Sequence, residues 1–508
     1  MKLSFLYPDG ITTKGALNGN EPNLGRIGVR TLYHLSLDKT FAAICEDDVP
    51  RQVFLKVLAM PTTDPAVITY RQQLLQAMAA KPAFFPELQD LYGRFRGLRD
   101  SHDRERQAMM RQIHNSTAGA SAQTLKNLLQ ANALTLMRCL AFVRNISDLL
   151  GDFRIGGDDC KSAALKRLYR ETTEISKSAA FDRLTALCKR FDDMGIDAVY
   201  DFAAELGETG QIELCRMIEH KYLKIVDPDF QPRRLWFSRR VEQQEDTGSC
   251  VRIHMIEDTT YDKLMSVPLQ LLAEQLDTLS DQLFDRFCHI ADELAFYDAA
   301  LRYLRSMEAR DVRVTYPAVS EGLDYDISGL RDLALIMEEA RTEPVIPNNI
   351  GGNSLRGMIV FGENNSGKTV FLRSLGTAQL LAQSGLPIPA DGAKMPICTQ
   401  IMTQFSEAEK EFERGNDAGR FEQEVRELAS VIDDLDPGAL ILLNETFQTT
   451  AYDEGAEGLY HILNYFSAQK IRFLLVSHLH QLEGRFSGGE VGVYRTQPGY
   501  KVCADVLY

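Results

Sequence analysis

The feature that most constrains the fold is a glycine-rich octapeptide, Gly362-Glu-Asn-Asn-Ser-Gly-Lys-Thr369, which has the pattern G-x-x-x-x-G-K-T. The apolar run Met358-Ile-Val-Phe361 precedes it and has the length of a strand, and a helical segment starts at Val370. A strand, such a loop and a helix together form the phosphate-binding loop of nucleotide-binding proteins. The sequence therefore predicts a site for nucleotide phosphates, and a chance glycine turn is the alternative.

Each residue type in this octapeptide suits one part of phosphate chemistry. Glycines let backbone amides face phosphate oxygens at the N-terminus of a helix. Lys368 is expected to reach the β and γ phosphates, and the hydroxyl of Thr369 is expected to bind Mg²⁺. The residues predicted to bind ATP are Gly362, Asn364, Asn365, Ser366, Gly367, Lys368 and Thr369.

A second apolar run, Ala439–Leu443, ends in Asn444 and Glu445. In phosphate-loop hydrolases the first acidic residue after such a strand holds a water of Mg²⁺, and the next carboxylate polarises the attacking water. Glu445 stands at the position of that carboxylate. Asn444 keeps an oxygen but no charge, and charge-assisted hydrogen bonds are about twice as strong as neutral ones. The sequence therefore predicts weak Mg²⁺ affinity and slow turnover without loss of nucleotide binding.

A third apolar run, Ile471–Val476, ends in Ser477 and His478. Ligands of open α/β sheets bind beyond the carboxyl ends of the strands, so His478 could sense the γ-phosphate, and a structural histidine is the alternative. The three apolar runs are separated by helical segments, which is typical of buried parallel strands. Residues 316–508 are therefore predicted to form an α/β domain.

The chain before this domain shows other patterns. Residues 1–65 mix short apolar alternations, as in Arg51-Gln-Val-Phe-Leu-Lys-Val57, with Gly, Pro and Asn, and are predicted to form a small α/β or irregular region. Residues 66–315 are predicted to form a helical core and lever domain, because helical periodicity persists to about residue 222 and resumes after about residue 259. A short strand insertion is expected near residues 228–259.

The segment Leu269–Met307 is the longest unbroken helical pattern and contains neither Pro nor Gly. A helix of this length would span roughly 55 Å, which exceeds the diameter of a small domain. We therefore expect a helix that bridges domains or acts as a lever, and a pair of shorter core helices is the alternative.

Charge and cysteine content narrow the classes of function. The net charge of −15 argues against a globally basic nucleic-acid binder but allows a local basic stripe. The nine cysteines are scattered without a Cys-x-x-Cys pair, so neither a disulfide framework nor a zinc site is predicted. No apolar run approaches the roughly 20 residues that cross a bilayer, and the first residues do not form a signal peptide. A cytoplasmic protein without a membrane partner is expected.

One local cluster could contact DNA. Arginines can contact phosphates, and the only tryptophan of the sequence, which lies among them, could stack on a base or a sugar. The alternative is an exposed strand face whose tryptophan anchors a core. The candidate DNA contacts are Arg233, Arg234, Trp236, Arg239 and Arg240.

The order of these motifs resembles the ATPase domain of the MutS family of DNA mismatch-repair proteins. The similarity is strong from about residue 340 to 480 and weaker from about 30 to 310. The upstream stretches Val345-Ile-Pro-Asn348 and Tyr70-Arg-Gln-Gln-Leu-Leu75 also resemble family segments. The positions that fit the family's loop, its Phe-x-x-Glu-Met-x-Glu segment and its Thr-His pair are Gly362, Asn364, Gly367, Lys368, Thr369, Phe421, Glu424, Glu427 and Ser477-His478.

The resemblance implies a multidomain fold, in which a mainly α-helical core and lever region precedes a C-terminal α/β P-loop NTPase domain of the ABC type. It implies a Mg²⁺-dependent ATPase with Glu445 and His478 as catalytic residues. Thr369 and, through water, Asn444 would form the metal site. The expected partners are a second copy of the chain and branched or mismatched DNA, in mismatch repair or a related repair or recombination process.

The sequence also departs from the family pattern. Asn444 replaces the usual Asp, Glu363 replaces the loop proline, and Gly419 replaces a serine that helps to complete the partner's nucleotide site. The start of the chain lacks room for the mismatch-reading domain, and residues 227–259 are fewer than the family's DNA-clamping insertion. These departures leave open a second hypothesis, a nucleotide-switched scaffold that binds another protein, hydrolyses little ATP and has no direct role on DNA.

Overall fold

The computed structural model divides into two compact units, which are described separately. Unit 1 comprises Met1–Phe85, Asp158–Leu165 and His289–Tyr508, and unit 2 comprises Pro86–Gly157 and Lys166–Cys288. The predicted domain boundaries at residues 65 and 315 stay predictions. The structure describes residues 3–8, 26–115, 122–193, 195–206, 212–226, 259–320, 322–338, 341, 343–352, 356–405, 417–447, 452–486 and 491–504.

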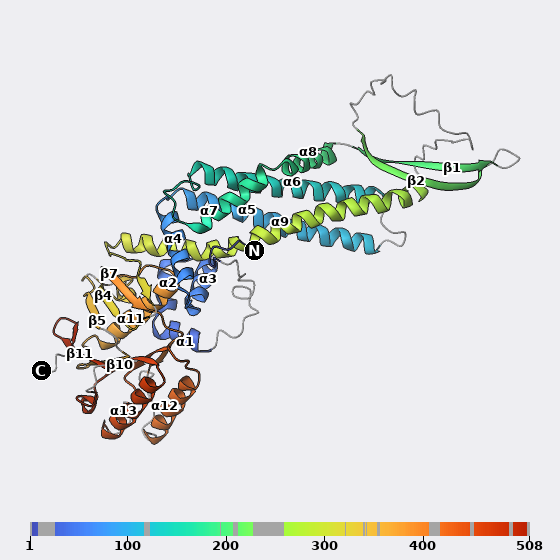
Figure 1. The fold of residues 1–508 in the computed structure, drawn as a ribbon. Coiled ribbons are helices and arrows are strands. Elements are labelled where there is room, and N and C mark those ends of the chain that lie inside the picture. The colour runs from blue at the N-terminus through green and yellow to red at the C-terminus, as the bar shows by residue number, and fades with distance from the viewer. Residues whose placement is uncertain are drawn as a thin grey trace. The chain divides into compact units, whose positions relative to one another are not determined.

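Unit 2 is built from long helices that lie alongside one another (Figure 1). Their apolar faces meet in an aromatic core, where the rings of Phe95 and Phe142 stack with centroids 3.8 Å apart and Phe284 lies 5.1 Å from Phe95. One 50-residue helix, α9, contains the predicted long helix, so the alternative of two shorter helices is wrong. The helices are α5 (Phe84–Asn115), α6 (Ala122–Asp152), α7 (Ala163–Ser176), α8 (Ala179–Asp193) and the unit 2 part of α9 (Thr259–Glu308).

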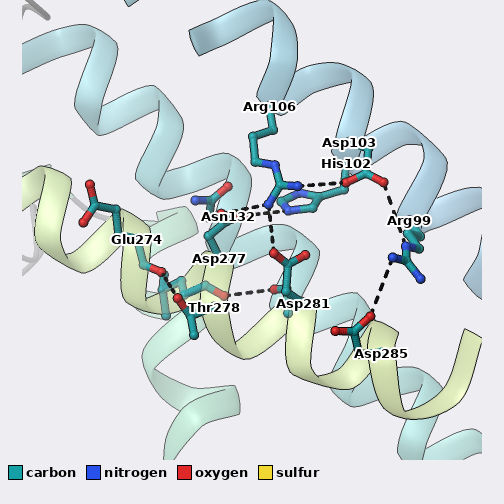
Figure 2. A network of polar contacts seen from close by, with 12 residues as sticks. Arg99, His102, Asp103, Arg106, Asn132, Glu274, Asp277, Thr278, Asp281 and Asp285 are labelled. Atoms are coloured by element: carbon teal, nitrogen blue, oxygen red, sulfur yellow. Dashed lines mark hydrogen bonds and ion pairs between the residues drawn. The ribbon is translucent and has the colours of Figure 1, made fainter.

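A polar network joins α5 to α9 within unit 2, as Figure 2 shows. The guanidinium of Arg106 donates hydrogen bonds to Asp277 (3.1 Å) and Asp281 (2.9 Å), and Nε2 of the buried His102 lies 2.7 Å from Asp277. Burial raises the pKa of Asp277, but the hydrogen bonds from His102 and Arg106 outweigh burial and lower the pKa below its usual value. The network thus fixes the register of α5 against α9.

A two-stranded antiparallel ribbon follows α8 and consists of β1 (Gly195–Leu206) and β2 (Ile212–Val226). The prediction of helix up to about residue 222 is therefore wrong here. Apolar residues in this stretch fit helical spacing, but many are β-branched or aromatic, and such residues favour strands. The short strands predicted near 228–259 lie outside the described residues.

Unit 1 contains a six-stranded sheet with the order β12-β11-β6-β10-β9-β8. The five strands from β11 to β8 are parallel, and β12 pairs with β11 in the antiparallel sense. The three predicted apolar runs form β6, β9 and β10, which confirms them as buried parallel strands. The strands are β6 (Gly357–Phe361), β8 (Ile401–Phe405), β9 (Leu440–Asn444), β10 (Arg472–Ser477), β11 (Val491–Gln497) and β12 (Lys501–Ala504).

Helices cover this sheet and position its strand ends. α12 (Asp417–Ile432) and α13 (Tyr452–Ala468) bury apolar residues against the same core as Ile441 and Leu443 of β9. α11 (Lys368–Gln383) contacts β8, β9 and β10. A second, four-stranded sheet has the order β3-β7-β4-β5, with α10 (Leu333–Ile336) following β4. Its strands are β3 (Ala318–Ser320), β4 (Tyr325–Leu330), β5 (Asn348–Gly352) and β7 (Gly392–Pro396).

In the N-terminal region, predicted to be α/β or irregular, residues 3–8 have no regular element, but Arg51–Val57 lie in a helix, so the prediction of partly β structure is wrong there. Val53, Leu55 and Val57 alternate in the sequence, but the buried residues are Phe54, Val57 and Leu58, which have helical spacing. No helix among the residues described is long and apolar enough to span a membrane. The helices are α1 (Arg26–His34), α2 (Leu37–Ile44), α3 (Asp48–Ala59) and α4 (Pro65–Ala79).

Helix α1 packs against β8 at the edge of the six-stranded sheet. Nδ1 of His34 lies 2.9 Å from the hydroxyl of Thr403, and its ring stacks on Phe405 at 4.7 Å. Arg30 forms a 3.0 Å ion pair with Glu427 of α12. Burial first, and then the nearby positive charge of Arg30, lower the pKa of His34 from 6.5 to about 4.

This low pKa predicts a pH-dependent loss of stability. Between about pH 6.5 and pH 4, unfolded His34 is protonated while folded His34 is neutral, so unfolding takes up a proton and stability falls as the pH falls. Thermal unfolding of the protein and of His34→Gln, followed from pH 7 to pH 4.5, should show a shallower decline for the variant. The matched control is exposed His461→Gln. Identical slopes for His34→Gln and the unsubstituted protein would contradict the assignment.

Candidate functional site

The glycine-rich loop, Gly362–Gly367, connects β6 to α11. Gly367, the residue before the helix, has φ 92°, a left-handed conformation that glycine adopts without steric cost. A Cβ at Gly362 would lie 1.9 Å from Oγ1 of Thr496 in β11, so only glycine fits there. Oγ of Ser366 also lies 2.9 Å from Oγ1 of Thr496. The loop is therefore braced by β11.

Lys368 is folded back onto this loop. Its side chain is 4% exposed, and its ammonium donates hydrogen bonds to the carbonyl oxygens of Gly362 (2.7 Å) and Glu363 (2.9 Å). A carboxylate oxygen of Glu445 lies 3.2 Å from the same nitrogen. An ammonium has three donors and no acceptor. The three oxygens thus satisfy a buried positive charge, and an anion bound at the loop would compete with Glu445 for that charge.

Thr369 and Asn444 place two neutral oxygens together. The hydroxyl of Thr369, in the first turn of α11, donates a 2.9 Å hydrogen bond to Oδ1 of Asn444 at the end of β9. Hard cations such as Mg²⁺ prefer oxygen ligands. Among the described residues, no cluster of three or more His, Cys, Asp and Glu side chains forms a metal site. A Mg²⁺ ion held between these two side chains would meet neutral protein oxygens.

Glu445 links two strands of the site. One of its carboxylate oxygens contacts Lys368, and the other lies 2.8 Å from Nδ1 of His478, which follows β10. The carboxylate is 12% exposed, and the imidazole is 27% exposed. The ring of Tyr452, at the start of α13, meets the imidazole edge-on at 5.8 Å. A carboxylate held between a cation and an imidazole can accept a proton from a water molecule nearby.

The structure brings most of the predicted site residues together. Asn364 and Asn365 differ, because both are exposed and neither takes part in the contacts described above. Gly419 lies in the first turn of α12. The residues joined by the contacts above are Gly362, Ser366, Lys368, Thr369, Asn444, Glu445 and His478, and Gly367 lies in the chain between Ser366 and Lys368. The proposed DNA contacts Arg233, Arg234, Trp236, Arg239 and Arg240 lie outside the described residues.

Two contributors to the site were missed in the sequence. Thr496 braces the glycine-rich loop although it lies 130 residues beyond Ser366, and no motif surrounds it. Tyr452 contacts His478 from a different element. Neither residue has a spacing signal, because strand order places Thr496 beside the loop and the packing of α13 against β10 places Tyr452 beside His478.

Known proteins match this chain in two regions. Residues 358–489 match the family model of MutS domain V, and residues 63–310 match that of the MutS2 N-terminal domain. Both ranges lie within or close to the two regions of resemblance expected from the motifs.

Curated relatives also match. "Endonuclease MutS2" of Streptococcus thermophilus is 28% identical over 215 residues, which cover 42% of this chain and 26% of that protein. "DNA mismatch repair protein MutS" of Synechococcus elongatus is 26% identical over 228 residues, which cover 42% and 25%. "Endonuclease MutS2" of Streptococcus gordonii is 32% identical over 146 residues, which cover 28% and 18%. The matched region thus spans about a quarter or less of these relatives.

The two matched models both describe MutS proteins. Residues 63–310 include helices α4 to α9, and residues 358–489 include Lys368, Glu445 and His478. This chain belongs to the MutS family.

Proposed function

We propose that this protein is a Mg²⁺-dependent ATPase that couples its nucleotide state to DNA binding, in mismatch repair or a related DNA-repair or recombination process. The observation that carries the ATPase is that Glu445, after β9, contacts both Lys368 at the start of α11 (3.2 Å) and His478 after β10 (2.8 Å). The DNA part rests on membership of the MutS family and on relatives named for mismatch repair and as endonucleases.

ATP binding begins with an exchange of partners at Lys368. The β and γ phosphates offer the buried ammonium more negative charge than Glu445 does, so Lys368 moves from the carboxylate to the phosphates. The backbone amides of the glycine-rich loop and of the first turn of α11 face the phosphates. Glu445 loses its cation and is left with the imidazole of His478. Binding of the substrate thereby frees the carboxylate that acts on water.

The Thr369 and Asn444 oxygens fit a Mg²⁺ site, because they lie 2.9 Å apart beside the loop. Thr369 would bind the ion directly and Asn444 through a water. The ion, when bound, neutralises negative charge on the phosphates during the reaction. Asn444 offers no charge to the metal-bound water, so affinity for the ion is low and turnover is slow.

Hydrolysis itself needs a base close to the attacking water. Glu445 accepts a proton from the water whose oxygen attacks the γ-phosphorus, and the bond to the ADP oxygen breaks. His478 holds the other carboxylate oxygen at 2.8 Å and so orients Glu445, and its imidazole senses the γ-phosphate. The protein further forms a homodimer in this proposal and binds branched or mismatched duplex DNA through the Arg233–Arg240 segment.

Substitutions at Lys368 and Glu445 should separate binding from hydrolysis. Lys368→Met removes the cation and should weaken ATP affinity at least tenfold, or about 1.4 kcal/mol. Glu445→Gln should not weaken ATP affinity but should lower kcat by about 10²-fold or more, because the base is lost. Both are checked by titration with a fluorescent ATP analogue and by phosphate release. Undiminished turnover in Glu445→Gln would remove Glu445 as the base.

The variant Asn444→Asp should restore a charge to the metal site. The added carboxylate still accepts the hydrogen bond from Thr369 and should lower the Mg²⁺ concentration at half-maximal turnover about fivefold, which corresponds to about 1 kcal/mol. The matched control is Asn464→Asp, which adds the same charge on the exposed side of α13. Equal Mg²⁺ dependence in all three proteins would place position 444 outside the metal site.

Coupling to DNA is tested by ATP turnover at low salt with plain, mismatched and branched duplexes. At least one DNA should change the rate, and Arg239→Glu with Arg240→Glu should weaken DNA binding and flatten its salt dependence. Arg104→Glu with Arg111→Glu, on α5, is the charge-matched control. If no DNA changes the rate of ATP turnover, the result would favour the nucleotide-switched scaffold that binds another protein.

A further inference from the structure

The three residues after β9, Glu445-Thr446-Phe447, form a strained turn that we name the acidic elbow. Glu445 has φ 51° and Phe447 has φ 65°, so two of its residues adopt the left-handed region although both carry side chains. Such conformations are costly for residues other than glycine, and they persist only where surrounding contacts impose them. The direction of the Glu445 carboxylate therefore depends on what holds this elbow.

Contacts from three directions hold the elbow. The backbone N–H of Glu445 donates a 3.0 Å hydrogen bond to the carbonyl of Val476 in β10. Phe447 is 3% exposed and lies in the core beneath α13. On the remaining side, the hydroxyl of Thr446 donates a 2.7 Å hydrogen bond to the side-chain oxygen of Gln404 in β8. Thr446 and Gln404 are each 1% exposed, so water does not compete for this bond.

The side chain of Gln404 is unusual for a strand interior. Its Nε2 is buried and has no hydrogen-bond partner among the residues that the structure describes. An unpaired buried amide lowers stability, and an apolar side chain of the same shape would avoid that loss. The one hydrogen bond of the Gln404 side chain found in the described structure is its bond to Thr446. Packing alone does not explain why an amide occupies this position. The need for a hydrogen-bond acceptor for Thr446 of the elbow does explain it.

We propose that Gln404 and Thr446 are positioning residues for Glu445. Their hydrogen bond ties the middle of the elbow to β8, the strand next to β9, and keeps the carboxylate directed between Lys368 and His478. The inference rests on the proposed function, because the direction of the carboxylate matters to turnover only if Glu445 acts as the base. Neither residue touches the nucleotide in this assignment, so nucleotide affinity should not fall when either of them is changed.

The test separates positioning from simple stabilisation. Thr446→Val is isosteric and removes the hydroxyl, which leaves the oxygen of Gln404 unpaired and lowers stability. The double variant Gln404→Met/Thr446→Val replaces both polar groups, so that stability should recover while the elbow stays untied. Thr446→Ser keeps the hydroxyl and serves as the rescue variant. Tyr325→Phe is the matched control, because it removes a buried hydroxyl-to-amide bond of 3.0 Å, to Gln379, away from the elbow.

We expect kcat to fall about tenfold or more in Thr446→Val and in the double variant, because small misplacements of a reacting group have large kinetic effects. The Kd for ATP should not rise, Thr446→Ser should restore turnover, and Tyr325→Phe should lower Tm but not kcat. If the double variant recovers both Tm and kcat, or if kcat follows Tm across all variants, the pair is only structural and the inference is wrong.

A second readout does not require hydrolysis. If the unsubstituted protein shows no turnover, the proposed function fails, and the ¹⁵N signals of the His478 imidazole still report its 2.8 Å contact with Glu445. These signals should change in Thr446→Val and in the double variant but not in Thr446→Ser or Tyr325→Phe. Unchanged signals in the double variant would show that Glu445 keeps its direction without the pair, and would overturn the inference on their own.

Discussion

The buried ammonium of Lys368 is the interaction around which the rest of the candidate site is arranged. A charge that is almost fully removed from water needs close partners, and here two loop carbonyls and Glu445 supply them. Glu445 in turn holds His478, so the three residues form one electrostatic unit. Any anion that binds at the loop must reorganise this unit, which ties occupancy of the site to the state of the carboxylate.

The parallel sheet makes this unit possible. β6, β9 and β10 are neighbours or next neighbours in the strand order, and their carboxyl ends meet at one edge. The residues after these strands can therefore lie within hydrogen-bonding distance although long helices separate them in the sequence. The acidic elbow after β9 fixes the direction of the Glu445 carboxylate. Its left-handed residues and its hydrogen bond to β8 direct this carboxylate between Lys368 and His478.

The elements that could be predicted from the sequence are those whose signal is local. The loop motif, the continuously apolar strands and the long helix α9 each depend on contiguous residues, and the structure contains all of them. Prediction failed in β1 and β2, where apolar spacing fits both helix and strand, and in α3, where a short alternation concealed a helical face. The contacts of Thr496 and Gln404 could not be predicted, because strand order alone brings them to the loop and the elbow.

The brace between Ser366 and Thr496 has a consequence for the order of folding. β6 lies between β11 and β10, both of which are made after it during synthesis. When β6 and the glycine-rich loop leave the ribosome, the strands that flank β6 in the sheet have not yet been synthesised. The geometry of the glycine-rich loop can thus form only after β11 has been made, and the apolar strand β6 stays without its neighbours in the sheet until β10 and β11 follow.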